Sequence, residues 1–176
     1  MNLKSLSKFL SLVLRHDPSK IGVTLDKNGW VDIDTLLNAL QNHGTTINRE
    51  TLIKIVETDN KKRYAIQDNK IRASQGHSIE VDLELKPITP PDILYHGTQA
   101  DYVYSIMRNG LKPGSRQYVH MSSNLSTAQT VGNRRGTNST ILTIDAKTAH
   151  KDGIKFFKSE NDVWLVKHMP NYYLSY

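Results

Sequence analysis

The chain has 176 residues, of which 38% are hydrophobic and 23% are charged, and its formal net charge is +6. This length fits one domain or two small ones, and the composition is too mixed for a disordered protein or a membrane protein. The chain has no cysteine, which excludes disulfides, thiolate metal sites and cysteine nucleophiles and fits a reducing compartment. We therefore expect a cytoplasmic protein with neither a signal peptide nor a membrane span.

The first half is predicted to form helices followed by a β-hairpin. Leucines at helical spacing predict a first helix that ends before Asp17. Asp32 or Asp34 is expected to cap a second helix, and Asn48 a third, before a hairpin over residues 63–73. This order is typical of a winged helix, a module that binds nucleic acid in some proteins and protein in others.

A proline-rich stretch separates the two halves. Pro87, Pro90 and Pro91 favour an extended backbone and forbid a helix, so we place a domain boundary at about residue 87. The expected units are residues 1–86 and 87–176.

The second half is predicted to alternate short strands with few helices. Strands are expected at residues 93–96, 118–121, 141–144, 155–157 and 163–166, and helices at residues 102–109 and 125–131. This pattern predicts an α+β fold with a small, mostly antiparallel β core.

The positive charge is concentrated in the second half of the chain. Residues 1–85 hold 12 basic and 11 acidic side chains, whereas residues 86–176 hold 11 and 6. This excess fits a phosphate-bearing partner such as a nucleic acid, and it also fits an ordinary basic surface. Charge alone does not decide between them.

Polar side chains gather at the end of the first predicted helix and around the hairpin. Arg15 and His16 close the helix, where positive charge also simply complements the helix dipole. Arg63 opens the hairpin and Arg72 leaves it, and an arginine that faces solvent there often only adds solubility. The stretch Gln75–Ser78 joins a flexible glycine to hydrogen-bonding side chains, which suits either a polar ligand or the tip of a loop.

A histidine stands at a predicted strand end in the second half. His96 precedes Gly97, whose lack of a side chain allows close approach of another backbone, and Thr98 follows. The backbone groups of Gly97 can hold a planar amide. Alternatively, His96 caps the next helix.

The richest polar segment follows that helix. Four polar side chains alternate along a predicted strand and so share one face: Arg116, Tyr118, His120 and Ser122. That face is either a polar cleft or a solvated sheet surface. Arg134 and Arg135 add two fixed charges to a loop flanked by glycines.

Several common sites lack support in the sequence. No HxxxH or HExxH spacing is present, so we expect no metal site. No GxSxG motif supports a serine hydrolase, and no GxxxxGK[ST] or GxGxxG motif supports a P-loop or Rossmann site.

Eight segments in this order make the sequence resemble the RNA 2′-phosphotransferase family, that of tRNA 2′-phosphotransferase, over nearly the whole chain. The segments are Leu10–Pro18, Gly29–Val31, Arg63–Tyr64, Ile71–Ser78, Tyr95–Thr98, Ser115–Arg116 with Val119–Ser122, Val131–Gly136, and Val163–Leu165. Their combination and order make this a strong signal. The sequence departs from the family at Tyr118, where a histidine is frequent, and in the less proline-rich ending 169–174.

The resemblance implies a winged-helix N-terminal lobe that binds RNA and an ADP-ribosyltransferase-like C-terminal lobe that binds NAD. It implies removal of an internal 2′-phosphate from RNA, as left at a tRNA splice junction. The phosphate attacks the anomeric carbon of the nicotinamide ribose and expels nicotinamide, and the neighbouring 2″-hydroxyl then attacks the phosphorus. The products are RNA with a 2′-hydroxyl and ADP-ribose 1″,2″-cyclic phosphate.

The resemblance also assigns roles to residues. The implied catalytic set is Arg15, His16, Arg63 and Arg116, in which arginines bind the phosphate and His16 is an acid–base or positioning group. The implied NAD contacts are His96, Gly97, Thr98, His120, Ser122 and Arg134. The implied RNA or phosphate contacts are Arg72, Gln75, His77, Ser78 and Arg135. Val163 stands where many protein ADP-ribosyltransferases carry a glutamate that activates the acceptor. An ionised phosphate is already a nucleophile, so it needs no such base.

Two alternatives stay open. An enzyme of the same fold would ADP-ribosylate a terminal nucleic-acid phosphate without the second step, and it would share the same NAD contacts. A winged-helix regulator with a degenerate second lobe would bind nucleic acid without NAD, although the intact arginines and histidines argue against it. We expect a monomer whose partners are NAD and an RNA, with tRNA the expected RNA, and no membrane.

Overall fold

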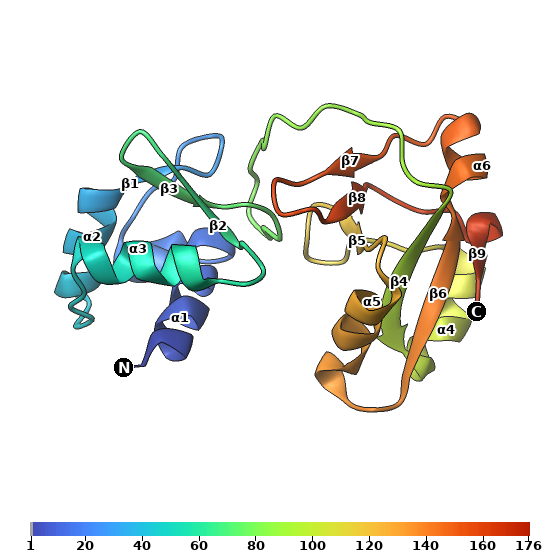
Figure 1. Ribbon diagram of the computed structural model, residues 1–176, viewed down its shortest axis with the longest axis horizontal. Helices are drawn as coiled ribbons and strands as arrows, with labels where there is room; N and C mark the ends of the chain where they lie inside the picture. Colours follow the sequence, from blue (N-terminus) through green and yellow to red (C-terminus); the bar gives the residue numbers. More distant parts are fainter. Residues whose placement is uncertain (1) are drawn as a thin grey trace. The chain divides into compact units, whose positions relative to one another are not determined.

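The computed structural model describes residues 2–176 and divides into two compact units (Figure 1). Unit 1 ends at Glu84, and unit 2 spans Leu85–Tyr176. Both units combine helices with small antiparallel sheets, so the α+β class expected from the sequence is confirmed. Among the described residues, no helix is long and apolar enough to cross a bilayer.

Unit 1 combines helices with an antiparallel sheet in the order β1-β3-β2. Its elements are α1 (Leu3–Arg15), the 3₁₀ turn η1 (Pro18–Ile21), β1 (Val31–Asp32), α2 (Ile33–Asn42), α3 (Arg49–Thr58), β2 (Tyr64–Gln67) and β3 (Lys70–Ala73). Asn2, Asp32 and Asn48 cap the α-helices by accepting a backbone N–H bond three residues on. The structure thus selects Asp32 from the two candidate caps of α2.

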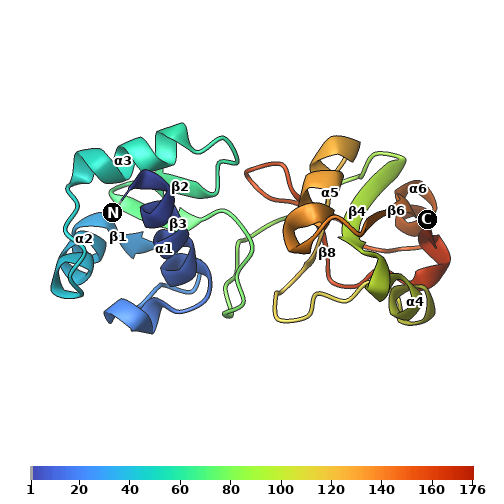
Figure 2. The ribbon, with the colours of Figure 1, turned by 90° about the horizontal axis from the view of Figure 1, so that it is seen from below.

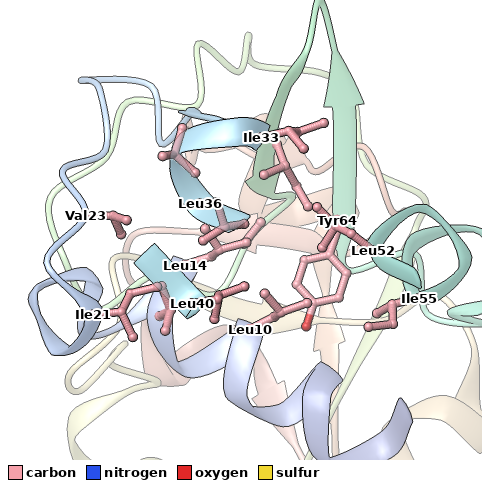
Figure 3. Close-up of a cluster of buried hydrophobic side chains, with 14 of the residues drawn as sticks. Leu10, Leu14, Ile21, Val23, Ile33, Leu36, Leu40, Leu52, Ile55 and Tyr64 are labelled. Carbon is pink, nitrogen blue, oxygen red and sulfur yellow. The ribbon is translucent and has the colours of Figure 1, made fainter. Parts of the chain in front are cut away.

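The core of unit 1 fills the space between its helices and its sheet (Figure 3). Its most buried leucines, at most 1% exposed, are Leu10, Leu14, Leu36, Leu40 and Leu52. Tyr64 adds its ring from β2, and its hydroxyl donates to the carbonyl oxygen of Ser7 at 2.6 Å. This packing fixes α1, whose C-terminal end carries Arg15 and His16.

The hairpin of unit 1 has a connection of only two residues. Gln67 pairs with Lys70, so the loop is Asp68–Asn69 alone. Both loop residues have positive φ, 49° and 61°. Such a two-residue turn matches the twist of the strands, and asparagine and aspartate tolerate this backbone conformation better than most residues.

Unit 2 contains two antiparallel sheets, β4-β6-β9 and β5-β8-β7. Its strands are β4 (Ile93–Gln99), β5 (Val119–Met121), β6 (Ser139–Asp145), β7 (Phe157–Lys158), β8 (Trp164–Val166) and β9 (Leu174–Ser175). Its helices are α4 (Ala100–Asn109), α5 (Leu125–Gly132) and α6 (Ala146–Lys151), with 3₁₀ turns η2 (Asn133–Arg135) and η3 (Asn171–Tyr173). The backbones of Tyr95 and Ser122 exchange two hydrogen bonds of 2.8 Å, which join the sheets. Figure 2 shows α5 beside β4.

Two expectations for unit 2 are wrong. β4 does not end at His96, because β6 pairs with it through Gly97 and on to Gln99. β5 is limited to Val119–Met121, so Arg116 lies before the strand, in a turn. The N–H of Arg116 donates to the carbonyl oxygen of Pro113 at 3.2 Å. Strand alternation therefore cannot place Arg116 on the face of His120.

Candidate functional site

Arg15 and His16 of unit 1 lie at the end of α1, where the segment Ser74–Ser78 returns to them. The N–H of Ser78 donates to the carbonyl oxygen of Arg15 at 2.9 Å. The Ser78 hydroxyl lies 2.8 Å from Nδ1 of His16. Gly76, at φ +92°, lies against the Arg15 side chain, because a Cβ there would sit 3.2 Å from the Arg15 Nε. The segment therefore holds both the backbone and the side chains at the end of the helix.

Arg72 is buried, at 8% exposure, so a purely solubilising role does not fit it. Its guanidinium lies 4.4 Å from the centre of the Trp30 ring. Its Nη1 donates to the carbonyl oxygen of Asn28 at 3.2 Å. A stacked and hydrogen-bonded arginine of this kind is a fixed positive charge.

His77 is a buried histidine next to positive charges. It is 2% exposed. Burial, with Arg15, Arg72 and His16 nearby, lowers its pKa to about 4, so the imidazole is neutral at pH 7. Within residues 2–176, neither of its ring nitrogens has a hydrogen-bond partner, nor does the buried Oε1 of Gln75. Such groups are uncommon in folded proteins and suit a water or a polar ligand.

Arg63 is held at the entry to β2 by an aspartate that the sequence analysis did not single out. Its Nη1 donates to Oδ1 of Asp59 at 2.5 Å, and its backbone N–H donates to Oδ2 at 2.8 Å. No sequence signal points to this aspartate, because the i,i+4 rule applies to residues on one helix and α3 ends at Thr58. The carbonyl oxygen of Arg63 accepts from the N–H of Ser74 at 2.7 Å, so the segment Ser74–Ser78 touches this residue as well.

In unit 2, two histidines and one arginine form a hydrogen-bonded chain. Nδ1–H of His96 donates to the carbonyl oxygen of His120 at 2.7 Å, so His96 does not act as a helix cap. Burial lowers the pKa of His96, which is therefore neutral at pH 7 with Nε2 as an acceptor. Nη1–H of Arg116 donates to Nδ1 of His120 at 2.9 Å, which leaves the proton of a neutral His120 on Nε2. The chain thus fixes opposite tautomers in the two rings.

Arg116 is surrounded by further positive charge. Burial, together with Arg134 and Arg135, lowers its pKa, and arginine still stays protonated at neutral pH. Arg134 and Arg135 lie in the exposed turn η2. Three arginines gathered in this way favour the binding of an anion.

Gln99 holds the turn η2 in place, and no sequence pattern pointed to this role. Its Nε2 donates to the carbonyl oxygens of Gly132 (2.5 Å) and Gly136 (3.2 Å), which lie on either side of η2.

Another backbone does approach Gly97 closely, as its lack of a side chain predicts, and this backbone is that of α5. A Cβ on Gly97 would lie 1.8 Å from the carbonyl oxygen of Ala128 and 2.7 Å from the N of Gly132. Thr98 follows on β4, paired with Thr140. Ser122 lies just after β5, and its hydroxyl donates to the carbonyl oxygen of Asn124 at 3.1 Å. These residues border the histidine chain on β4 and β5.

Each unit therefore holds arginines and histidines in fixed positions. Such side chains are typical of proteins that bind phosphate groups. Among residues 2–176, no three histidine, aspartate or glutamate side chains gather as a metal site requires.

The comparison with known proteins identifies the family. Residues 2–168 match the family described as RNA 2′-phosphotransferase, Tpt1 / KptA family, and the chain belongs to it. A relative from Hahella chejuensis is 49% identical over 175 residues, covering 98% of this chain and 94% of the relative. Relatives from Flavobacterium johnsoniae and Streptomyces coelicolor are each 48% identical, covering 98% and 97% of this chain and 96% and 93% of their own lengths. All three are named "Probable RNA 2′-phosphotransferase".

Proposed function

We propose that this chain is an NAD-dependent RNA 2′-phosphotransferase that acts through an ADP-ribosylated RNA intermediate. The expected products are RNA with a 2′-hydroxyl, nicotinamide and ADP-ribose 1″,2″-cyclic phosphate. The observation that carries the proposal is the family match over residues 2–168. The proposed substrate is a tRNA of the splice-junction type, and the proposed setting is a cytoplasmic monomer.

The proposal assigns one lobe to each unit. Unit 1 is proposed to be a winged-helix, RNA-binding lobe, which its order of α1, α2 and α3 before the β2–β3 hairpin supports. Unit 2 is proposed to be an ADP-ribosyltransferase-like, NAD-binding lobe, which its small antiparallel sheets and its histidine chain support.

The residues of the histidine chain fit NAD. NAD supplies an electrophilic ribose carbon that carries nicotinamide as its leaving group. His96, with Nδ1–H already donated, offers Nε2 as an acceptor to a ribose hydroxyl, and His120 offers Nε2–H as a donor. Gly97, Thr98 and Ser122 border these rings, and Arg134 suits the negative diphosphate.

The arginines are proposed to act on the transferred phosphate. Arg15, Arg63 and Arg116 are assigned to the RNA 2′-phosphate, because a guanidinium binds phosphate oxygens in pairs and keeps its charge as charge develops on phosphorus. His16 is assigned to acid–base or positioning work at a hydroxyl or the leaving RNA oxygen. Arg72, Gln75, His77 and Arg135 are proposed RNA or phosphate contacts.

A single assay tests the proposal. The protein is mixed with a short RNA that bears one internal 2′-phosphate, with and without NAD, and both the RNA and nicotinamide are followed. We expect phosphate loss and nicotinamide release that both require NAD. Nicotinamide release with the phosphate retained would instead indicate ADP-ribosyl transfer alone, and no change in either would indicate a nucleic-acid-binding protein.

A further inference from the structure

One segment of unit 1, Ser74–Ser78, contacts every candidate catalytic residue of that unit. At its start, the N–H of Ser74 donates to the carbonyl oxygen of Arg63 at 2.7 Å. At its end, the N–H of Ser78 donates to the carbonyl oxygen of Arg15 at 2.9 Å, and the Ser78 hydroxyl lies 2.8 Å from Nδ1 of His16. We name it the 74–78 segment.

We propose that Ser78 is a positioning residue, which orients the imidazole of His16 rather than binding RNA itself. The inference rests on the proposed function, in which His16 is a catalytic group. Ser78 would act only through His16, by holding Nδ1 and so directing Nε2 toward the reacting groups.

The backbone places the Ser78 hydroxyl accurately enough for this role. The hydrogen bond from its own N–H to Arg15 ties it to the residue next to His16. The segment is also anchored between its ends, because His77 is 2% exposed and borders Gly29, where a Cβ would lie 3.4 Å from its Nε2. Gly76, at φ +92°, supplies a turn that leaves room for the Arg15 side chain.

A hydroxyl suits a histidine that changes protonation during a reaction. It donates to an unprotonated Nδ1 and accepts from a protonated one, so the ring keeps its orientation in both states. A carboxylate, which only accepts, or an ammonium group, which only donates, would favour one state in the same place. Ser78 also lies on the surface, so removing its hydroxyl leaves no cavity and costs little stability.

The test is a double-mutant cycle on Ser78 and His16. Single-turnover rates of intermediate formation and of phosphate transfer are measured on a 2′-phosphorylated RNA with NAD. We expect Ser78→Ala to slow by about tenfold the same step that His16→Ala slows. In the His16→Ala background, the same change should alter that rate by less than about twofold, because the effect passes through the imidazole.

Two variants serve as controls. Ser78→Thr keeps the hydroxyl and should retain the rate to within about threefold. Ser5→Ala makes the same chemical change on the exposed N-terminal turn of α1 and should behave as the wild type. If the rate losses of Ser78→Ala and His16→Ala instead multiply in the double variant, or if the two changes slow different steps, Ser78 contacts the RNA directly and the proposal is wrong.

A measurement without substrate separates this proposal from the proposed function. The ¹⁵N chemical shifts of the His16 ring report which nitrogen is hydrogen-bonded. We expect the Nδ1 shift to move in Ser78→Ala and to be restored in Ser78→Thr. An unchanged Nδ1 shift in Ser78→Ala overturns the proposed contact even if the enzyme is active. If the wild type does not act on the RNA, the proposed function is wrong, and the Nδ1 shift still tests the contact between Ser78 and His16.

Discussion

At the scale of single residues, Arg63 and Arg116 should matter most for phosphate transfer from the intermediate. Negative charge on phosphorus oxygens grows in that step, and the loss of one preorganised donor costs about 10²–10³ in rate in comparable sites. We expect Arg63→Ala and Arg116→Ala to accumulate ADP-ribosylated RNA, which gel analysis of single-turnover reactions would show.

Matched arginines outside the candidate site provide the controls. Arg49 pairs with Asp34 at 2.8 Å, with side chains 42% and 64% exposed, so Arg49→Ala removes a weak surface pair. Arg108 stacks on Tyr104 on the exposed face of α4, so Arg108→Ala is the matched control in unit 2. Complete turnover at the wild-type rate in both Arg63→Ala and Arg116→Ala would contradict the roles assigned to these arginines.

His77 should make the stability of the protein depend on pH. Its pKa is about 4 in the folded chain, against 6.5 for a model histidine. Below pH 6.5 the unfolded chain binds a proton that the folded chain does not, so the free energy of unfolding falls as pH drops toward 4. The expected loss is about 2 kcal/mol between pH 7.5 and pH 5.

Urea unfolding of wild type and His77→Gln at these two pH values measures that loss. The variant cannot take up the proton, so its free energy of unfolding should fall by about 2 kcal/mol less between pH 7.5 and pH 5 than that of the wild type. His43→Gln, which removes an exposed imidazole at the end of α2, should keep the wild-type dependence. Equal pH dependence in wild type and His77→Gln would show that His77 is not held neutral.

At the scale of elements, the contact between β4 and α5 holds the histidine strand in place. Gly97→Ala would put a Cβ 1.8 Å from the carbonyl oxygen of Ala128, so strand and helix must separate. We expect a loss of about 3 kcal/mol in the free energy of unfolding, together with weaker NAD binding. Gly153→Ala, at φ +101° with no atom within 4 Å of the new Cβ, should cost only about 1 kcal/mol of backbone strain. Equal stability of the two variants would contradict this packing.

The same elements show what the sequence could predict. Helices α1, α2 and α3 follow from leucine spacing and from the caps Asp32 and Asn48, which are local signals. The strand β9 is too short to leave such a pattern and exists through its pairing with β6. The helix α6 has a capping aspartate, Asp145, but its six residues are too few for a repeated apolar spacing. Arg116 reaches His120 through a turn that starts at Pro113, and strand alternation contains no information on that geometry.

At the scale of the whole molecule, the net charge of +6 resides mostly in unit 2, which holds 11 basic and 6 acidic side chains. Arg116, Arg134 and Arg135 lie close enough together to affect the pKa of Arg116. Each phosphate contact releases counterions, so RNA affinity should fall with salt, with a log–log slope of about −0.7 per contact on single strands.

Titrations of RNA binding over a range of salt, without NAD, test where those contacts are. The Arg135→Ala variant should bind more weakly and lower the magnitude of the slope by about 0.7, because one phosphate contact is lost. The Arg108→Ala variant removes the same charge from another part of unit 2 and should keep the wild-type slope. Equal slopes in both variants would mean that net charge, rather than Arg135 beside Arg116, draws the RNA.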